Sequence, residues 1–469
     1  MPSPTQQIDL LIEGGIVITV DSERRIFNPG YVAIKDGRIV DVGQGGASGV
    51  SPRERLDATD MVVLPGLVNS HNHLDQSVHR GCHDEDPDSR TKMLDLSRAL
   101  TRERAFIAAS ASLLEQVEFG ITTTHESHWT HYHKDSTLGV CDAIRHSGMR
   151  AVVARSMCDE GHFPDAITHA DFRERIGDVL ADLDSLAGEY DSERMQIISE
   201  PTTMQRCTPD AIVAMRDWAF RNDKIWHIHL AQHEAELQHA LKTIGMGSVQ
   251  YAEQLGVLGP EMLAAHCGGL LDKEVALLGE YRVRVAHCPL TIIRSGGTVP
   301  PIWELERAGA TVAVGTDGSA TNNGQNLWES MKLAVYLQRV RFGQRDLGSA
   351  EQALELATIK AARALGLEQR VGSLEAGKAA DIALFRLDQL SIAPEAALVN
   401  NLVYSSVSNR ADTVMVGGKI ILKSGESTVF DKVEVVARLR ETQASMIREA
   451  GLATSIRLAA TWPVSTAAG

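Results

Sequence analysis

Short apolar runs at both ends of the chain alternate with turn residues, and this pattern predicts β-strands. The runs near the start are Leu10 to Val20, Tyr31 to Lys35 and Arg38 to Val42, and those near the end are Asp381 to Phe385, Thr413 to Val416 and Lys419 to Leu422. Between two of the early runs, Lys35-Asp36-Gly37-Arg38 has the composition of a hairpin turn. Strand-rich ends around a long middle predict one small β-sandwich domain built from both termini.

The middle of the chain alternates short apolar strands with helical patterns. The expected strands are Ala151 to Ala154, Gln196 to Ile198, Ile225 to Leu230, Leu263 to Ala265, Val283 to Ala286 and Thr311 to Val314, and helical periodicity is clearest at Thr101 to Phe119 and Asp210 to Arg221. Repeated β-α units over roughly 300 residues favour an α/β fold of the (β/α)8 TIM barrel type. A doubly wound sheet would need a phosphate-binding loop after its first strand, and Pro65-Gly66-Leu67-Val68 is not one.

These patterns divide the chain into four segments. Residues 1–62 and 371–430 form the two parts of the β-sandwich, and residues 63–370 form the barrel. Residues 431–469 form a helical tail, in which the amphipathic stretch Val433 to Leu458 predicts a helix that packs on the barrel or on a partner subunit.

Composition and charge narrow the class of partner. The 469 residues are 43% hydrophobic and carry a formal charge of −15, with no basic block, so we expect neither a nucleic acid nor an anionic membrane as partner. A small neutral or cationic substrate fits this charge. The start of the chain has no signal-peptide pattern, and no apolar run reaches the ~18 residues of a membrane span. Six cysteines without CxxC spacing are typical of a cytoplasmic protein.

Two histidines follow the first strand of the middle segment. The apolar run Val63 to Val68 is interrupted by a Pro-Gly pair and then delivers His71 and His73. Residues i and i+2 of an extended chain point to the same side, so both imidazoles face one point in space. Two convergent imidazoles at a strand end form half of a metal site.

Later strands end in similar residues, and in a barrel these ends meet on one face. They deliver His227 and His229, then His266, then His287, and finally Asp317. Three imidazoles and a carboxylate suit zinc, iron(II), cobalt or manganese, with a position left for water. We expect His227 and His287 to be hydrogen-bonded structural residues, and Asp317 taken alone could also be a helix N-cap.

Seven motifs together resemble the amidohydrolase superfamily, in its mononuclear cytosine deaminase and triazine hydrolase branch. They are LPGLVNSHNHLDQS, GITTTHESH, HIHLAQHEAE, AAHCGGLLDKE, AHCPLT, VGTDGSATNN and GSLEAGKAADIALF. The resemblance implies one divalent ion per subunit, preferably zinc, and a homo-oligomer. It also implies site residues: the metal ligands His71, His73, His229 and Asp317, and the water-activating His266.

One position departs from the deaminase pattern. Deaminases of this branch have a glutamate three residues after the third histidine ligand, where this chain has Gln232. A glutamine cannot transfer a proton near neutral pH, so attack on an aromatic nitrogen ring should be impaired. Glu234 or Glu200 could replace the missing glutamate. Binuclear relatives carry a carboxylated lysine on the fourth strand, where this chain has Glu200 and no lysine, which favours a single metal.

The stretch from Gly120 to His133 is rich in histidine and aromatic residues. His128 or Trp129 could contact the substrate, or the stretch could be a polar loop over the barrel mouth. A second metal here lacks partners at matching spacing. Asn322, which follows Asp317, is also expected at the substrate side of the site, where it fixes the loop around the metal.

The sequence therefore predicts a metal-dependent hydrolase that cleaves the carbonyl C–N or C–S bond of a urea-, amide- or carbamate-type substrate. The metal polarises an open-chain carbonyl, His266 and Asp317 relay the proton, and Gln232 orients the substrate. In size and layout the chain resembles the phenylurea hydrolase and molinate hydrolase group, which act on phenylurea and thiocarbamate herbicides. The alternatives are an aminohydrolase or chlorohydrolase of a nitrogen heterocycle such as cytosine, guanine, a pterin or an s-triazine, and a scaffold that has lost catalysis.

Overall fold

The computed structural model describes residues 6–82, 88–163, 170–405 and 408–456. Its strands are β1 (Gln6–Glu13), β2 (Ile16–Ile18), β3 (Ile26–Phe27), β4 (Gly30–Lys35), β5 (Arg38–Gln44), β6 (Val50–Asp57), β7 (Met61–Pro65), β8 (Leu67–Asn69), β9 (Ile121–His128), β10 (Arg150–Met157), β11 (Met195–Pro201), β12 (Trp226–Leu230), β13 (Met262–His266), β14 (Arg284–His287), β15 (Thr311–Val314), β16 (Ile382–Arg386), β17 (Thr413–Val416), β18 (Lys419–Lys423) and β19 (Glu426–Ser427).

The α-helices are α1 (Ser89–Ser97), α2 (Arg102–Glu118), α3 (Ser136–Ser147), α4 (Ile176–Tyr190), α5 (Pro209–Arg221), α6 (Glu234–Ile244), α7 (Ser248–Gln254), α8 (Asp272–Glu280), α9 (Pro289–Ser295), α10 (Ile302–Ala308), α11 (Leu327–Phe342), α12 (Ala350–Leu356), α13 (Ile359–Ala364), α14 (Leu398–Tyr404) and α15 (Lys432–Glu449). Three short 3₁₀ helices are η1 (Leu74–His79), η2 (Ala170–Phe172) and η3 (Glu395–Ala397).

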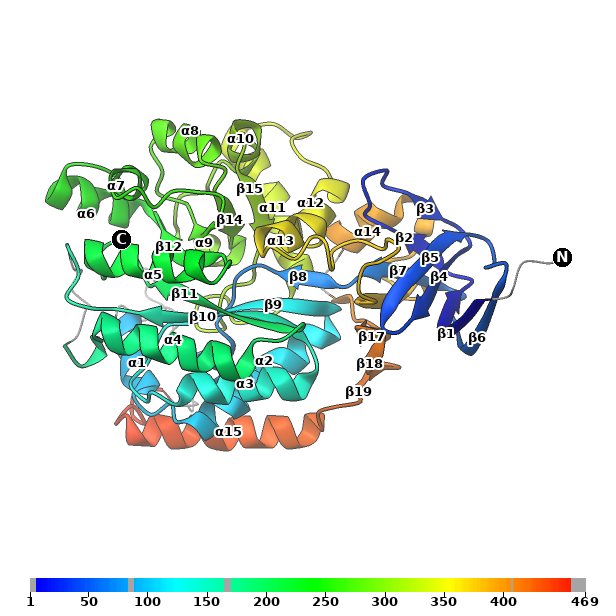
Figure 1. Ribbon diagram of the computed structural model, residues 1–469, viewed down its shortest axis with the longest axis horizontal. Coiled ribbons are helices and arrows are strands. Elements are labelled where there is room, and N and C mark those ends of the chain that lie inside the picture. Colours follow the sequence, from blue (N-terminus) through cyan, green and yellow to red (C-terminus); the bar gives the residue numbers. More distant parts are fainter. Residues whose placement is uncertain (1–5, 83–87, 164–169, 406–407, 457–469) are drawn as a thin grey trace, which may run out of the picture.

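The middle segment contains two four-stranded parallel sheets with helices outside them (Figure 1). Their strand orders are β11-β10-β9-β8 and β12-β13-β14-β15, each strand pairing with its neighbour in sequence. Single backbone bonds connect the two sheets, from Ser70 N to Val314 O at 3.2 Å and from His229 N to Thr202 O at 3.2 Å. This α/β order agrees with the predicted barrel.

Capping residues set the starts of the helices that the sequence predicted. Thr101 accepts a hydrogen bond from the backbone N–H of Arg104, and α2 begins at the next residue, Arg102. Thr208 caps α5 in the same way, with Pro209 in the first turn, where a missing N–H has no cost.

The smaller part of the molecule joins strands from both ends of the chain, which lie together in Figure 1 as blue and orange ribbons. Its seven-stranded sheet has the order β19-β18-β17-β16-β7-β2-β3, and a second sheet has the order β5-β4-β1-β6. The run Leu10 to Val20, predicted to be rich in β-structure, contains the end of β1 and the whole of β2. Gly14 has φ +92°, which ends β1, and the two halves enter different sheets.

The Pro-Gly pair after Leu64 is the junction between the two parts. β7 belongs to the seven-stranded sheet, whereas β8, one residue later, opens the parallel strands. A side chain at Gly66 would collide with Thr122 on β9, and the Gly66 N–H donates to Asp381 O at 2.9 Å. The close approach of Gly66 to Thr122 fixes the start of β8 and therefore the position of His71 and His73, which follow it.

The C-terminal helix α15 lies along α2, outside the parallel strands (Figure 1). Met446 is buried against the core, and Arg104 on α2 pairs with Glu449 at 2.8 Å. The helix ends near Gly451, which has φ +71°, and so is shorter than the predicted Val433 to Leu458, whose last two residues lie outside the described part. Within the described ranges, no helix combines the length and apolarity needed to cross a membrane.

A buried ion pair connects the two parts of the molecule and yields a stability prediction. Arg150 on β10 donates to Asp381 at 3.1 and 3.3 Å, and Asp381 also accepts from Gly417 N at 2.8 Å. Asp381→Ala leaves a buried guanidinium unpaired, so we expect it to destabilise the fold by about 3–5 kcal/mol. Urea unfolding followed by circular dichroism measures this loss.

The exposed pair of Arg386 and Asp388 supplies the control. Asp388→Ala should leave the unfolding midpoint unchanged, because water replaces the interaction. Equal midpoints for both variants would contradict the role of Asp381.

Candidate metal centre

The candidate site lies where the parallel strands end, and the backbone there is strained. Ala231, His266, Cys267 and Asp317 follow or end three of these strands and have φ values of +48°, +77°, +53° and +61°. Residues with side chains rarely adopt this left-handed conformation, and it costs free energy at each position. The fold therefore holds these side chains in set directions.

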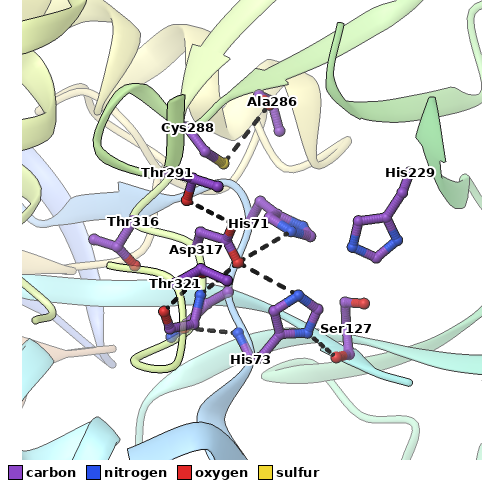
Figure 2. Close-up of polar contacts among 12 residues, drawn as sticks. His71, His73, Ser127, His229, Ala286, Cys288, Thr291, Thr316, Asp317 and Thr321 are labelled. Atoms are coloured by element: carbon purple, nitrogen blue, oxygen red, sulfur yellow. Dashed lines mark hydrogen bonds and ion pairs between the residues drawn. The ribbon is translucent and has the colours of Figure 1, made fainter. Parts of the chain in front are cut away.

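His71, His73 and Asp317 converge on one point (Figure 2). The Asp317 Oδ1 atom lies 3.4 Å from His73 Nε2 and 3.9 Å from His71 Nε2. The opposite nitrogen of His73, Nδ1, lies 2.5 Å from the Ser127 carbonyl oxygen, so Nδ1 carries the proton and Nε2 presents a lone pair. The strand itself ends at Asn69, so both imidazoles lie in the segment that follows it.

His229 approaches from the opposite sheet. Its Nδ1 atom lies 3.1 Å from the Thr202 carbonyl oxygen, which again leaves Nε2 as the lone-pair donor. Its ring centroid lies 5.0 Å from that of His71 and 5.5 Å from that of His73. The three rings and the carboxylate thus surround a common space.

Two hydrogen bonds hold Asp317 as a charged acceptor. Thr291 Oγ1 donates to Oδ2 at 2.7 Å, and the Gly318 N–H donates to Oδ1 at 2.6 Å. Burial alone would raise the pKa of Asp317, but the nearby His73 and His266 and these two hydrogen bonds lower it below its usual value.

His266 completes the group at the end of β13. Its ring centroid lies 5.4 Å from His71 and 5.5 Å from His229. Burial lowers the pKa of His266 to about 3, against the attraction of Asp317, so its imidazole is neutral at pH 7. The structure thus brings together all five residues that the resemblance implied.

The donor set fits a divalent cation. Both ring nitrogens of His71 are buried without a hydrogen-bond partner, and burial keeps its pKa well below the usual value. Donor atoms of His71, His73 and Asp317 lie within 4.8 Å of one another, as do those of His71, His229 and His266. Imidazole nitrogens with one carboxylate oxygen suit zinc or a similar ion.

A small cleft with a cavity volume of about 40 Å³ opens above these residues. Its lining consists of His73, Gln76, Arg90, Met93, Trp129, Thr202, Thr203, Arg206, His229, Gln232, His266, Asp317 and Thr321. Gln232 and Trp129, both expected at the substrate, therefore face the cleft.

The glutamates near Gln232 do not reach the cleft. Glu234 is exposed and accepts from Gln238 on the same helix. Glu236 accepts from the backbone N–H groups of Ala231 and Gln232 and so holds the loop. Glu200 is buried beside His229. Among the described residues, Asp317 is the one carboxylate that lines the cleft.

His128 and Asn322 lie away from the cleft lining. Ser127 on β9 faces Glu200, so by strand alternation His128 points to the opposite face, where its Nε2 atom lies 2.8 Å from Ser136 Oγ. Asn322 donates to the carbonyl oxygens of Thr316 and Gly324 at 2.5 and 2.9 Å, which fixes the loop after Asp317.

Several residues in the site were not singled out from the sequence, although Thr291 and Gln76 stand within the motifs AHCPLT and LPGLVNSHNHLDQS. Thr291 supports Asp317 from α9, and Met93 and Gln76 line the cleft from α1 and η1. His227 has the polar partner expected of a structural residue, because its Nδ1 atom lies 3.2 Å from Glu200 Oε2. For His287 the expectation of a hydrogen bond is wrong, because neither of its ring nitrogens has a partner in the described part of the chain.

Comparison with known proteins places this geometry in a family. The model of the amidohydrolase family matches residues 62–421. A 5-methylthioadenosine/S-adenosylhomocysteine deaminase of Moorella thermoacetica is 33% identical over 419 residues, covering 88% of this chain and 94% of the relative.

Two crystal structures are also similar over nearly the whole chain. An adenosine deaminase from Xanthomonas campestris with bound zinc has a TM-score of 0.87 at 25% identity, covering 95% of this chain and 100% of that one. An atrazine chlorohydrolase from Arthrobacter aurescens TC1 complexed with zinc has a TM-score of 0.84 at 27% identity, covering 92% and 100%.

The hydrogen bond from Thr291 to Asp317 predicts a change in metal affinity. Thr291→Val keeps the shape of the side chain but removes the donor, so we expect zinc to bind this site 10–100-fold more weakly. Competition with a fluorescent zinc chelator measures the affinity. Thr291→Ser retains the hydroxyl and should bind zinc as the wild type does; equal weakening in both variants would contradict this role.

The buried acid beneath η1 predicts a pH dependence of stability. Glu126 accepts from Leu74 N at 2.6 Å, and burial raises its pKa from 4.5 to about 8. The unfolded glutamate ionises first, so the metal-free wild type should lose stability relative to Glu126→Gln as the pH rises from about 4.5 to 8, by at most about 5 kcal/mol. Urea titrations at several pH values measure the difference, and parallel profiles would contradict it.

Proposed function

The chain belongs to the amidohydrolase family, and from this premise we propose that it is a metal-dependent aminohydrolase that releases ammonia from an amino-substituted nitrogen heterocycle. The observation that carries the proposal is the match, along nearly the whole chain, to a deaminase whose named substrates contain adenine. The zinc-containing structures of an adenosine deaminase and an atrazine chlorohydrolase support the same class of ring substrate. These relatives favour the heterocycle alternative over the urea and carbamate substrates expected from the sequence.

Different residues of the site have different roles in such a reaction. A bound divalent ion would supply Lewis acidity and lower the pKa of water. Ser127 and Thr202 fix the rings of His73 and His229 so that one nitrogen of each is available to the ion. Asp317 and His266 line the cleft, and we assign to them the transfer of a proton from water to the leaving nitrogen.

The cleft suits a flat ring. Trp129 lies on its wall and is held edge-on by Phe172, with ring centroids 5.6 Å apart and an interplanar angle of 80°. A fixed indole offers a face for stacking against a heterocycle. The Gln232 amide can donate to or accept from the ring edge, but it cannot transfer a proton.

A second candidate follows from Gln232 itself. No carboxylate other than Asp317 lines the described cleft, so a ring nitrogen has no second acid to protonate it. An open-chain carbonyl, as in a urea, anilide or thiocarbamate, does not need that step. The preference for zinc, the homo-oligomer and the cytoplasmic location stay predictions of the sequence.

A product screen with the metal-replete enzyme separates the candidates. One set holds adenosine, 5′-methylthioadenosine, guanine and aminotriazines, and the other holds N-aryl ureas, anilides and thiocarbamates. We expect ammonia from the first set, measured by a coupled assay and mass spectrometry. Release of an aniline or another amine from the second set alone would contradict the aminohydrolase and support the second candidate.

Gln232→Glu tests the role of the amide. A carboxyl group there can transfer a proton to a ring nitrogen, so kcat/KM for the heterocycle should rise tenfold or more. Gln232→Ala removes the hydrogen-bond donor and the acceptor of the amide, so it should lower kcat/KM. If Gln232→Glu lowers the rate on the best substrate, no proton is needed at that position and the ring mechanism is contradicted.

A further inference from the structure

Beneath the candidate metal centre, the parallel strands enclose a second group of donors that the proposed reaction does not use. It consists of His125 on β9, His227 on β12 and Glu200 on β11, and we name it the deep cluster. His227 is two residues before His229, which places it roughly 6.6 Å deeper along the strand. His71 lies between the two groups, with its ring 5.0 Å from that of His227 and 5.8 Å from that of His125.

The side chains of the deep cluster are completely buried and closely spaced. The rings of His125 and His227 lie 4.5 Å apart, and His227 Nδ1 lies 3.2 Å from Glu200 Oε2. Donor atoms of His71, His125 and His227 lie within 4.8 Å of one another, and so do those of Glu200, His227 and His229. Each of these two groups includes one ligand of the first site, His71 or His229, and His227 belongs to both.

Several of these donor atoms also lack a hydrogen-bond partner. Both ring nitrogens of His125 and the Nε2 atom of His227 are buried without a hydrogen bond from any described residue, whereas His227 Nδ1 pairs with Glu200 Oε2. Native proteins rarely leave such groups unsatisfied. The Oε1 atom of Glu200 accepts from Ser127 Oγ at 2.9 Å, and no lysine or arginine ion pair to Glu200 is found in the described ranges. A buried carboxylate without a cationic side chain is typical of a metal ligand.

We propose that the deep cluster binds a second divalent cation of the zinc type, with His125 and His227 as imidazole ligands and Glu200 as the carboxylate ligand. His71 keeps its place at the first site. The set of two imidazoles and one carboxylate occurs in protein zinc sites, with the fourth position open. This site differs from the first in every ligand, and the proposal does not depend on which substrate the enzyme takes.

Zinc stoichiometry tests the proposal. Metal-free protein is saturated with ZnCl₂, freed of excess metal by gel filtration and analysed by inductively coupled plasma mass spectrometry. We expect two zinc ions per wild-type chain and one in His125→Asn or His227→Asn. Wild-type saturation at one zinc ion, or two zinc ions retained in both variants, would overturn the proposal.

His287→Asn is the matched control, because His287 is equally buried and unpartnered but lies on β14, outside the deep cluster. It should still bind two zinc ions. Cobalt(II) titration gives a second readout: the visible absorption should grow over two equivalents in the wild type and over one in His125→Asn. If a variant fails to fold, the number of zinc ions bound by the wild type can still overturn the proposal.

Discussion

The convergence of buried histidine and aspartate side chains is the constraint on which the rest of the structure depends. Burial lowers the pKa of His71 and His266, so these rings are neutral lone-pair donors, whereas Asp317 remains an anion because His73, His266, Thr291 and Gly318 stabilise its charge. Neutral imidazoles beside a buried carboxylate favour a cation between them. The same arrangement in a protein without an ion would leave many polar atoms unsatisfied.

The scaffold supplies the directions that this convergence needs. Left-handed backbone at His266 and Asp317 aims these side chains inward, and carbonyl oxygens from β9 and from the residue after β11 set the tautomers of His73 and His229. The smaller part of the molecule contributes to the site indirectly, because β7 lies in its seven-stranded sheet. Gly66, which follows β7, packs against Thr122, and the first parallel strand begins at the next residue.

Much of the fold and of the candidate site could be predicted from the sequence, because these features depend on local patterns. Thr311–Val314 is a strand as predicted, and the spacing of His71 and His73 indicated convergence before any tertiary contact was known. Other features depend on contacts between distant segments. The face of β9 that carries His128 follows from strand register, the support of Asp317 comes from Thr291 on another element, and the partners of His125 are contributed by β11 and β12. Substrate choice depends on the cleft lining, in which the sequence indicated the metal-site residues, Trp129 and Gln232, but not Met93, Thr203 or Arg206.

The zinc content of relatives with the same fold agrees with a metal-dependent reaction at these strand ends, and the cleft above them explains how a substrate reaches the site. The most direct test of this account is an anomalous difference map, recorded at the zinc absorption edge from crystals grown with zinc. The account predicts a strong peak within ~2.0–2.2 Å of the ligand atoms of His71, His73, His229 and Asp317. A map without a peak among these four side chains, from protein that is active, would contradict it.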